Sequence, residues 1–242
     1  MCFLDRAYVA LYNFTMWDTV SVENLLRSHA DEKYREFHGG LTKTAYERVG
    51  VRVPVLRSMA KDIIKSGEWR EFLAARPVRL YEHAMLLGVV SASVKEPYED
   101  KIERLERFSR FVDDWAVCDI TCSSLRCKDE RLFGDMARFA GSGDVWLARI
   151  GLVVLLGNYA DGEHVDGLRE VINGVRAQGY YVDMAVGWLI ATVESHTEGG
   201  GLELMRTARL SPEIKKIAAA KMRDSFRVSE ESKREASRIA KG

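Results

Sequence analysis

The sequence is poor in proline, and it contains no long apolar run and no strand-like pattern. Only four prolines occur in 242 residues, so few positions interrupt a helix. No segment alternates apolar and polar residues as a half-buried strand does. No apolar stretch approaches the roughly 20 residues that cross a bilayer, and the first residues lack the pattern of a secretory signal. We therefore expect an all-α protein of the cytoplasm without a membrane anchor.

Cysteine is also scarce, and its distribution argues against a disulfide framework. Cys118, Cys122 and Cys127 crowd within ten positions of one helical segment, and the fourth cysteine is Cys2. This clustering favours a reducing compartment. A zinc site built on the three clustered thiols is the alternative, but their spacing is not that of a CxxC pair. We favour buried free thiols. Because no nucleotide-binding or metalloprotease motif occurs, we expect neither cofactor nor metal.

The formal net charge is zero, which alone argues against a nucleic-acid partner. The charges are unevenly distributed, however. Residues 206–242 hold eleven Lys and Arg against five Asp and Glu, and residues 33–65 hold eight against three. Two basic segments thus flank a more acidic middle. If both segments face one groove, a neutral protein can present a local positive surface.

Helix signals recur along the whole chain. Ser21 is a candidate N-cap for residues 22–30, Pro54 suits a first helical turn, and Ser211 followed by Pro212 predicts a helix over residues 214–226. About a dozen helices joined by short turns predict a stacked solenoid of the HEAT type, whose repeats run roughly 40 residues. We expect one repeat domain over residues 21–242. Residues 1–20 are predicted to be an arm, either disordered or upstream of the natural start.

The segment DDWAVCDITCSSL, residues 113–125, carries the most informative pair of side chains. Trp115 and Asp119 are four residues apart, so a helix places them on one face. An indole beside a carboxylate is a poor core pair but suits the binding of a flat or cationic group. The alternative is that Trp115 packs in the core and Asp119 is a solvated or capping acid.

A second pattern links Trp115 with Arg149 and Trp188. They are separated by 34 and 39 residues, which is close to one repeat length. Residues one repeat apart occupy equivalent places on successive helices and line one surface. The spacing therefore predicts a wall that bears Trp, Asp, Arg and Trp. Packing of the indoles between layers remains the alternative.

Several pieces of the chain, taken in their order, resemble the AlkD-like family of DNA alkylation repair proteins, which are all-helical HEAT-like glycosylases. The pieces are KYREFH, GVRVPVLRSMAK, DDWAVCD, DVWLARIGLVVLL, YYVDMAVGW and the tail from SPEIKK to DSFRVS, and they span residues 33–229. The resemblance implies an enzyme that hydrolyses the N-glycosidic bond of N3- and N7-alkylated purines in duplex DNA. It also implies action without flipping the base into a pocket, unlike the usual mode.

The same resemblance assigns the catalytic residues. It matches Asp119 to the family's catalytic acid, Trp115 and Trp188 to two aromatic walls, and Arg149 to the arginine of the neighbouring repeat. A set of aromatic and basic residues is expected to bind DNA along the groove and at its ends: Tyr34, Arg52, Arg57, Lys61, Lys215, Lys216, Lys221 and Arg223.

The expected partner is double-stranded DNA with alkylated purines. We expect a monomer that is associated with the nucleoid when it is bound to DNA. Two other functions stay open at this stage. One is a catalytically silent binder of damaged or structured DNA, and the other is a HEAT-type protein scaffold, which the neutral net charge favours.

Overall fold

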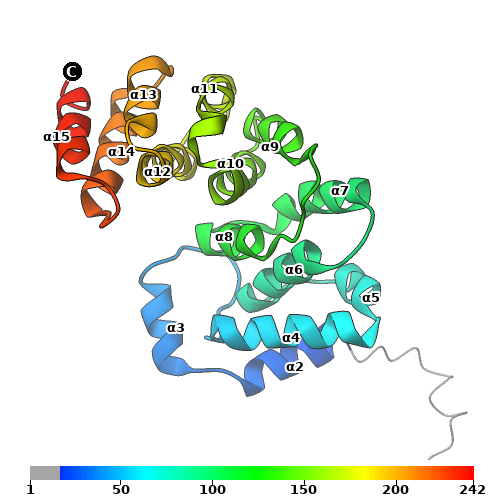
Figure 1. Ribbon diagram of the computed structural model, residues 1–242. Coiled ribbons are helices and arrows are strands. Elements are labelled where there is room, and N and C mark those ends of the chain that lie inside the picture. Colours follow the sequence, from blue (N-terminus) through cyan, green and yellow to red (C-terminus); the bar gives the residue numbers. More distant parts are fainter. Residues whose placement is uncertain (1–16) are drawn as a thin grey trace, which may run out of the picture. The chain divides into compact units, whose positions relative to one another are not determined.

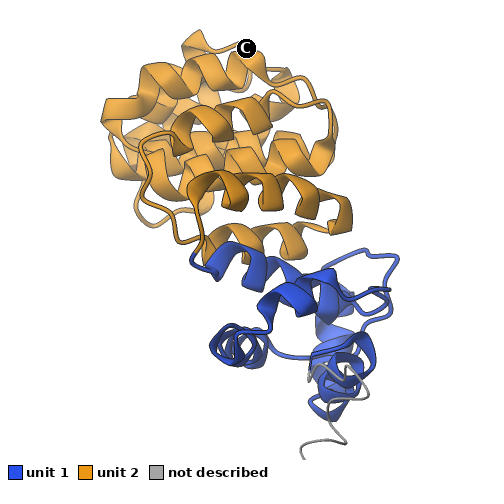
Figure 2. Ribbon diagram, turned by 90° about the vertical axis from the view of Figure 1, so that its right-hand side faces the viewer, with its two compact units in different colours: residues 1–95 blue, residues 96–242 orange. Residues whose placement is uncertain are grey.

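The computed structural model describes residues 17–242 (Figure 1). Helices and turns make up this part of the chain, and its β-structure is limited to an isolated bridge between Glu47 and Leu80. By its internal contacts the chain divides into two compact units, Met1–Lys95 and Glu96–Gly242 (Figure 2). The all-α class predicted from the sequence is confirmed.

Unit 1 is built around one buried helix. Its described residues form the helices α2 (Thr19–Ser28), α3 (Glu32–Gly39), α4 (Val53–Ser66), α5 (Trp69–Ala74) and α6 (Tyr81–Ser93). Almost every residue of α6 is buried, and α2, α4 and α5 pack against it. A helix that is apolar on all sides needs such cover. Helix α2 begins earlier than expected, because Asp18 and not Ser21 is its N-cap.

A buried carboxylate fixes the segment that leads into α4. Both oxygens of Glu82 accept backbone N–H bonds, from Val49 at 3.1 Å, Gly50 at 2.7 Å and Val51 at 3.3 Å. Gly50 has a φ of +86°, a left-handed conformation that favours glycine. A buried charge is tolerated where such bonds satisfy it, so Glu82 secures this segment of unit 1.

Unit 2 contains two layers of helices. Its elements are α7 (Tyr98–Phe108), η1 (Ser109–Phe111), α8 (Trp115–Ser124), α9 (Leu132–Ala140), α10 (Val145–Tyr159), η2 (Gly162–His164), α11 (Val165–Gly174), α12 (Tyr180–His196), α13 (Gly200–Thr207), α14 (Pro212–Asp224) and α15 (Glu230–Ile239). In one layer α8, α10, α12 and α14 pack in sequence, and in the other α9, α11, α13 and α15 do the same (Figure 1).

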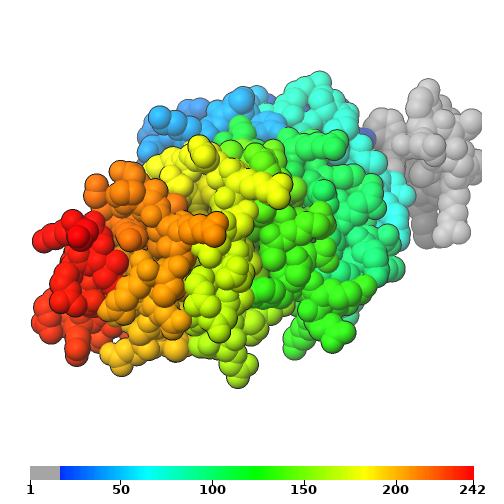
Figure 3. All heavy atoms as spheres, turned by 90° about the horizontal axis from the view of Figure 1, so that it is seen from above, coloured from blue at the N-terminus to red at the C-terminus, as the bar shows by residue number. Residues whose placement is uncertain are grey.

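Neighbours in this array are also neighbours in sequence, as the succession of colours from green to red shows (Figure 3). Packing of this kind is that of a helical repeat solenoid, which agrees with the predicted architecture. The HEAT type of the repeat stays a prediction. Helix α10 is central to the array, since residues 147–155 are buried without interruption and α8, α9 and α12 all pack against it.

Two glycines let helices approach closely in unit 2. A Cβ added at Gly151 of α10 would lie 2.5 Å from the carbonyl oxygen of Met136 in α9. A Cβ at Gly187 of α12 would lie 2.5 Å from Cγ2 of Ile217 in α14. Both separations are shorter than real Cβ contacts, so a larger residue at either position would push two backbones apart. Gly187 therefore sets the approach of α14 to α12.

Other predictions on the fold have mixed outcomes. Ser211 caps α14 as predicted, with Pro212 in the first turn. Cys118 and Cys122 are buried free thiols, and Cys127 is a half-buried one.

The bounds of the arm and the repeat domain remain predictions, because residues 1–16 lie outside the described residues. Among residues 17–242, none of the helices has both the length and the apolar character needed to cross a bilayer.

Candidate functional site

A cavity of about 310 Å³ opens in unit 2 on the layer formed by α8, α10, α12 and α14. Each of these four helices contributes at least one side chain. Its lining consists of Trp115, Asp119, Arg149, Tyr180, Tyr181, Met184, Trp188 and Lys221. The four predicted catalytic residues are therefore gathered in one place. The catalytic role of these residues is not tested by their positions and stays a prediction.

The start of α8 positions Trp115 and Asp119. The buried carboxylate of Asp114 caps the helix by accepting a hydrogen bond from the N–H of Ala116 at 2.8 Å. Trp115 is the first residue of the helix, and Asp119 follows one turn later. This i, i+4 spacing brings both side chains to the cavity, as the sequence predicted.

Asp119 is held by an arginine from the next helix of the layer. Nε of Arg149 donates to Oδ1 of Asp119 at 3.1 Å, and Nη2 donates to Oδ2 at 2.9 Å. The third nitrogen, Nη1, donates to the main-chain oxygen of Tyr181 at 2.7 Å. Arg149 is only 4% exposed, so this is a buried bidentate pair of the kind for which guanidinium is suited. Its planar fork fixes the orientation of the carboxylate.

Burial has the largest effect on the acidity of Asp119. It raises the pKa of this carboxyl, and the negative charge of Asp114 raises it further, whereas Arg149 opposes both. The Asp119 side chain keeps 17% of its surface exposed. A carboxylate offers about four lone-pair positions, of which Arg149 uses two. The remaining positions can accept a water or approach a positive centre in the cavity.

Aromatic side chains from α12 form another wall. Trp188 is 36% exposed and Tyr180 68% exposed, although both are large aromatic residues. The ring of Tyr181 contacts the ring of Tyr180 at 5.4 Å and that of Trp146 at 4.7 Å between centroids. Exposed aromatic faces that line a hollow are suited to bind flat, sugar-like or cationic groups.

Lys221 of α14 completes the cavity. Its Nζ lies 5.6 Å from the centroid of the Trp188 ring. Burial lowers the pKa of this ammonium, and the like charge of Arg149 adds to the effect. The sequence placed Lys221 among the basic residues at the end of a groove, whereas the structure places it in the cavity itself.

The predicted DNA-binding residues of α14 other than Lys221 lie outside the cavity lining. Lys216 and Arg223 are exposed, and Lys215 is half-buried. Nε of Arg223 lies 3.6 Å from Oδ1 of Asp224. These three side chains extend the positive charge of the helix along its accessible surface.

Unit 1 holds the other predicted DNA-binding residues. The guanidinium of Arg52 lies 5.1 Å from the centroid of the Tyr34 ring and pairs with Asp31 at 2.8 Å. Tyr34 and Arg52 are thus brought together within this unit. Arg57 is half-buried on α4, and Lys61 is exposed one turn later. Their convergence with the cavity of unit 2 stays a prediction.

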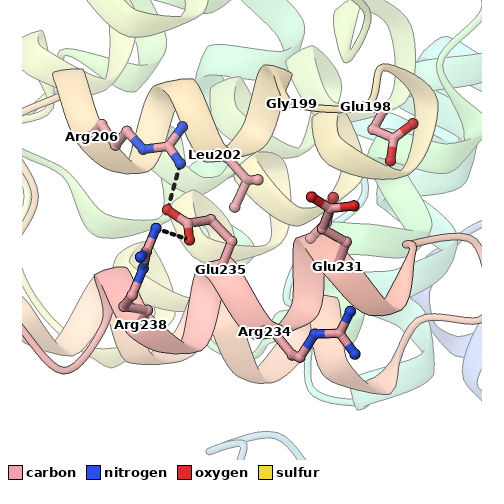
Figure 4. Close-up of a pocket in the computed structure, with 9 residues that line it drawn as sticks. Glu198, Gly199, Leu202, Arg206, Glu231, Arg234, Glu235 and Arg238 are labelled. Carbon is pink, nitrogen blue, oxygen red and sulfur yellow. Dashed lines mark hydrogen bonds and ion pairs between the residues drawn. The ribbon is translucent and has the colours of Figure 1, made fainter.

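A larger hollow of about 860 Å³ lies between α13 and α15. It is lined by equal numbers of acidic and basic residues, Glu198, Glu231 and Glu235 against Arg206, Arg234 and Arg238. Glu235 pairs with both Arg206, at 2.6 Å, and Arg238 (Figure 4). Because Glu235 pairs with two of the three arginines and the lining charges balance in number, the smaller cavity at Asp119 is the better candidate for chemistry.

Sequence reasoning missed Tyr180, Tyr181 and Met184 as lining residues. The pattern at residues 180–188 held a usable signal, since i, i+4 and i, i+8 from Tyr180 give Met184 and Trp188 on one helical face. A bidentate guanidinium such as that of Arg149 is suited to bind a phosphate. This guanidinium is instead engaged by Asp119 and by the carbonyl of Tyr181.

The fold and the cavity together define an all-helical repeat protein with a cavity lined by a carboxylate and two indole rings. The chain belongs to the family described as DNA alkylation repair enzyme, whose model matches residues 22–199. This range includes Trp115, Asp119, Arg149 and Trp188, and it ends before Lys221. No curated protein and no solved structure matches the chain. Family membership supports a role in DNA repair, with DNA as the partner and enzymatic repair as the activity.

Proposed function

We propose that the protein is a DNA glycosylase that hydrolyses the N-glycosidic bond of N3- and N7-alkylated purines in duplex DNA. The observation that carries the proposal is the cavity in which the Asp119 carboxylate lies among the rings of Trp115, Trp188 and Tyr181. Family membership supports it, because alkylated bases are the lesions that such proteins repair. The proposed partner is an alkylated duplex, bound by a monomer in the cytoplasm.

The chemistry requires a negative charge near the sugar. An N3- or N7-alkylated purine is cationic, and its departure leaves positive charge on the deoxyribose, much as in glycoside hydrolysis. A carboxylate that is already oriented stabilises this charge without reorganising. Arg149 orients Asp119 through two hydrogen bonds and leaves lone pairs that can align a water for attack at C1′.

The surrounding rings and cations suit the rest of the nucleotide. The faces of Trp115 and Trp188 can contact the deoxyribose and the cationic base. The exposed cations of α14, Lys216 and Arg223, can contact phosphates, which position a duplex without reading its sequence. Arg149 is in this account a positioning residue for Asp119.

The direct test is formation of abasic sites in N7-methylated duplex DNA. We expect the full-length protein to release N7-methylguanine well above the spontaneous rate, which a protein-free control measures. Undamaged duplex should yield no abasic sites. Release at the spontaneous rate would contradict the proposal.

A catalytically silent binder of damaged or structured DNA is the second candidate. The observation that favours it is that both carboxylate oxygens of Asp119 accept hydrogen bonds from Arg149. The outcome that identifies it is tight binding of duplex DNA without base release. Binding must then weaken with salt, because phosphate contacts release counterions. An affinity that does not change with salt would instead favour a protein scaffold.

A further inference from the structure

Lys221 is an amine placed inside the cavity without a carboxylate partner. Among residues 17–242, no acidic side chain pairs with it, although Asp119 lines the same cavity. Its contact is with the ring of Trp188, at 5.6 Å. A lysine whose role was structural would be expected to form an ion pair or to extend into solvent. Lys221 is half-buried and its amine lies over the ring of Trp188, so the amine is available to a ligand.

The packing of α14 on α12 keeps the amine in this position. Gly187 lies beside Trp188 in α12 and contacts Ile217 and Ala218 of α14. Lys221 follows Ile217 by one turn, so it lies on the same face of α14 and is directed along α12 toward Trp188. Its place in the cavity is therefore set by helix packing and not by a flexible loop.

We propose that Lys221 is a nucleophile that forms an imine with the aldehyde of an abasic site, and so gives the protein an abasic-site lyase activity. This inference rests on the proposed function, since the excised site is an abasic deoxyribose left in the same cavity. Ring opening of that sugar exposes an aldehyde at C1′. Primary amines of lysine form Schiff bases with such carbonyls. The substrate class is an aldehyde within the DNA backbone.

The proposed step balances without any oxidant or reductant. Neutral Nζ adds to C1′, and loss of one water gives the imine. A base then removes a proton from C2′, the C2′–C3′ double bond forms, and the C3′–O bond breaks. The 3′ fragment leaves with a 5′-phosphate. One water hydrolyses the imine and regenerates Lys221. Asp119 is the one carboxylate that lines the cavity, and it is placed to accept the C2′ proton.

The surroundings of Lys221 favour the neutral amine that this chemistry needs. Burial and the nearby charge of Arg149 both lower the pKa of Lys221. Desolvation and a neighbouring cation are the two means by which proteins activate lysine as a nucleophile. Lys128, an exposed lysine outside the cavity lining and outside the proposed DNA-binding surface, provides the control.

The experiment is trapping by borohydride. The full-length protein is incubated with a duplex that carries one abasic site made from deoxyuridine, and sodium borohydride reduces any imine to a stable amine. We expect a covalent protein–DNA band with the wild-type chain and with Lys128→Arg. The band should fall to background with Lys221→Arg, which retains the charge, and with Lys221→Gln. Digestion and mass spectrometry should locate the adduct on Lys221.

No trapped band with the wild-type chain, or a band that persists in Lys221→Arg, would overturn the proposal. Thermal unfolding of each variant shows whether loss of the band reflects loss of fold, and Lys221→Met is a further variant if Lys221→Gln fails to fold. The abasic substrate is made in advance, so the result does not depend on base excision. A trapped band without release of N7-methylguanine would reject the glycosylase activity and support the lyase activity. Release of N7-methylguanine without a trapped band would support the glycosylase activity and reject the lyase activity.

Discussion

Arg149 and Asp119 form a bidentate ion pair between successive helices of one layer, with N–O distances of 3.1 and 2.9 Å. The pair joins α10 to α8, and Nη1 of the same arginine binds the first turn of α12. One buried side chain thus connects three helices that line the cavity. The orientation of the proposed catalytic carboxylate is therefore tied to the packing of the repeats.

Replacing Arg149 by Gln should shift the acid limb of base release to higher pH. The folded-state pKa of Asp119 is already raised by burial, and Arg149 is the main influence that lowers it. Since the reaction needs the carboxylate, activity is lost as pH falls through this pKa, and removal of Arg149 raises that pH. The measurement is the rate of N7-methylguanine release between pH 4 and 8. Arg149→Lys, which keeps a cation, should shift the acid limb of the pH–rate profile less. An acid limb at the same pH in Arg149→Gln as in the wild type would contradict the effect of Arg149 on the pKa of Asp119.

The same variant should be less stable. Removing one partner of a buried ion pair leaves an uncompensated charge and costs about 3–5 kcal/mol. Because Asp119 retains some exposure, we expect a value near the lower end of that range. Urea unfolding at pH 7 measures it. A loss below about 1 kcal/mol, the level of exposed pairs, would show that the pair is effectively solvated.

Gly187→Ala should loosen the contact between α12 and α14. The new Cβ would lie 2.5 Å from Cγ2 of Ile217, and overpacking of this kind costs about 1–3 kcal/mol. Gly134→Ala is the matched control, since a Cβ there meets nothing within 4 Å in helix α9 and alanine favours helix. Thermal or urea unfolding compares the two. Equal stability of both variants would contradict the close approach of the helices.

His83 should make unit 1 sensitive to acid. Both of its ring nitrogens are buried without a hydrogen-bond partner among the described residues, and burial lowers its pKa to about 4. The unfolded chain, with a histidine pKa near 6.5, binds the proton more strongly, so stability falls as pH decreases from about 6.5 to 4. At pH 5 the loss is about 2 kcal/mol. His83→Leu should remove this contribution. Urea unfolding of the wild-type and His83→Leu chains at pH 7 and pH 5 measures how much stability each loses on acidification. An equal loss in both chains would contradict the prediction.

Charge reversal on α14 should weaken duplex binding. Lys216→Glu and Arg223→Glu remove exposed cations that are proposed to contact phosphates. Each lost contact should reduce the slope of log affinity against log salt by about 1. Lys128→Glu, at an exposed position outside the proposed surface, is the control for net charge. Unchanged affinity at low salt would mean that the α14 cations are only solvated.

Much of the cavity could be predicted because the fold is repetitive. The spacing of Trp115, Arg149 and Trp188 approximates one repeat, and a repeat places such residues on equivalent helices of one layer. The helix cap at Ser211 also follows from local sequence. These features depend on residue spacing along single helices, which the sequence contains directly.

The pairing of side chains between helices could not be predicted. Whether Arg149 faces a phosphate or Asp119 depends on the distance between α8 and α10, which close packing at residues such as Gly151 determines. The place of Lys221 depends likewise on how α14 lies against α12. The network in which Glu82 binds three backbone N–H groups is non-local and has no sequence signature.

The measurement that tests the central claim most directly is the rate of N7-methylguanine release by Asp119→Asn. Asparagine has nearly the same shape but leaves the buried Arg149 without its counter-charge, so the variant should be less stable and, while folded, should still bind duplex DNA. It lacks the negative charge that stabilises the developing sugar cation, a contribution of about 10²–10³ in rate. After subtraction of spontaneous depurination, we predict a loss of this size with duplex affinity maintained. Release by Asp119→Asn at the wild-type rate would contradict the account.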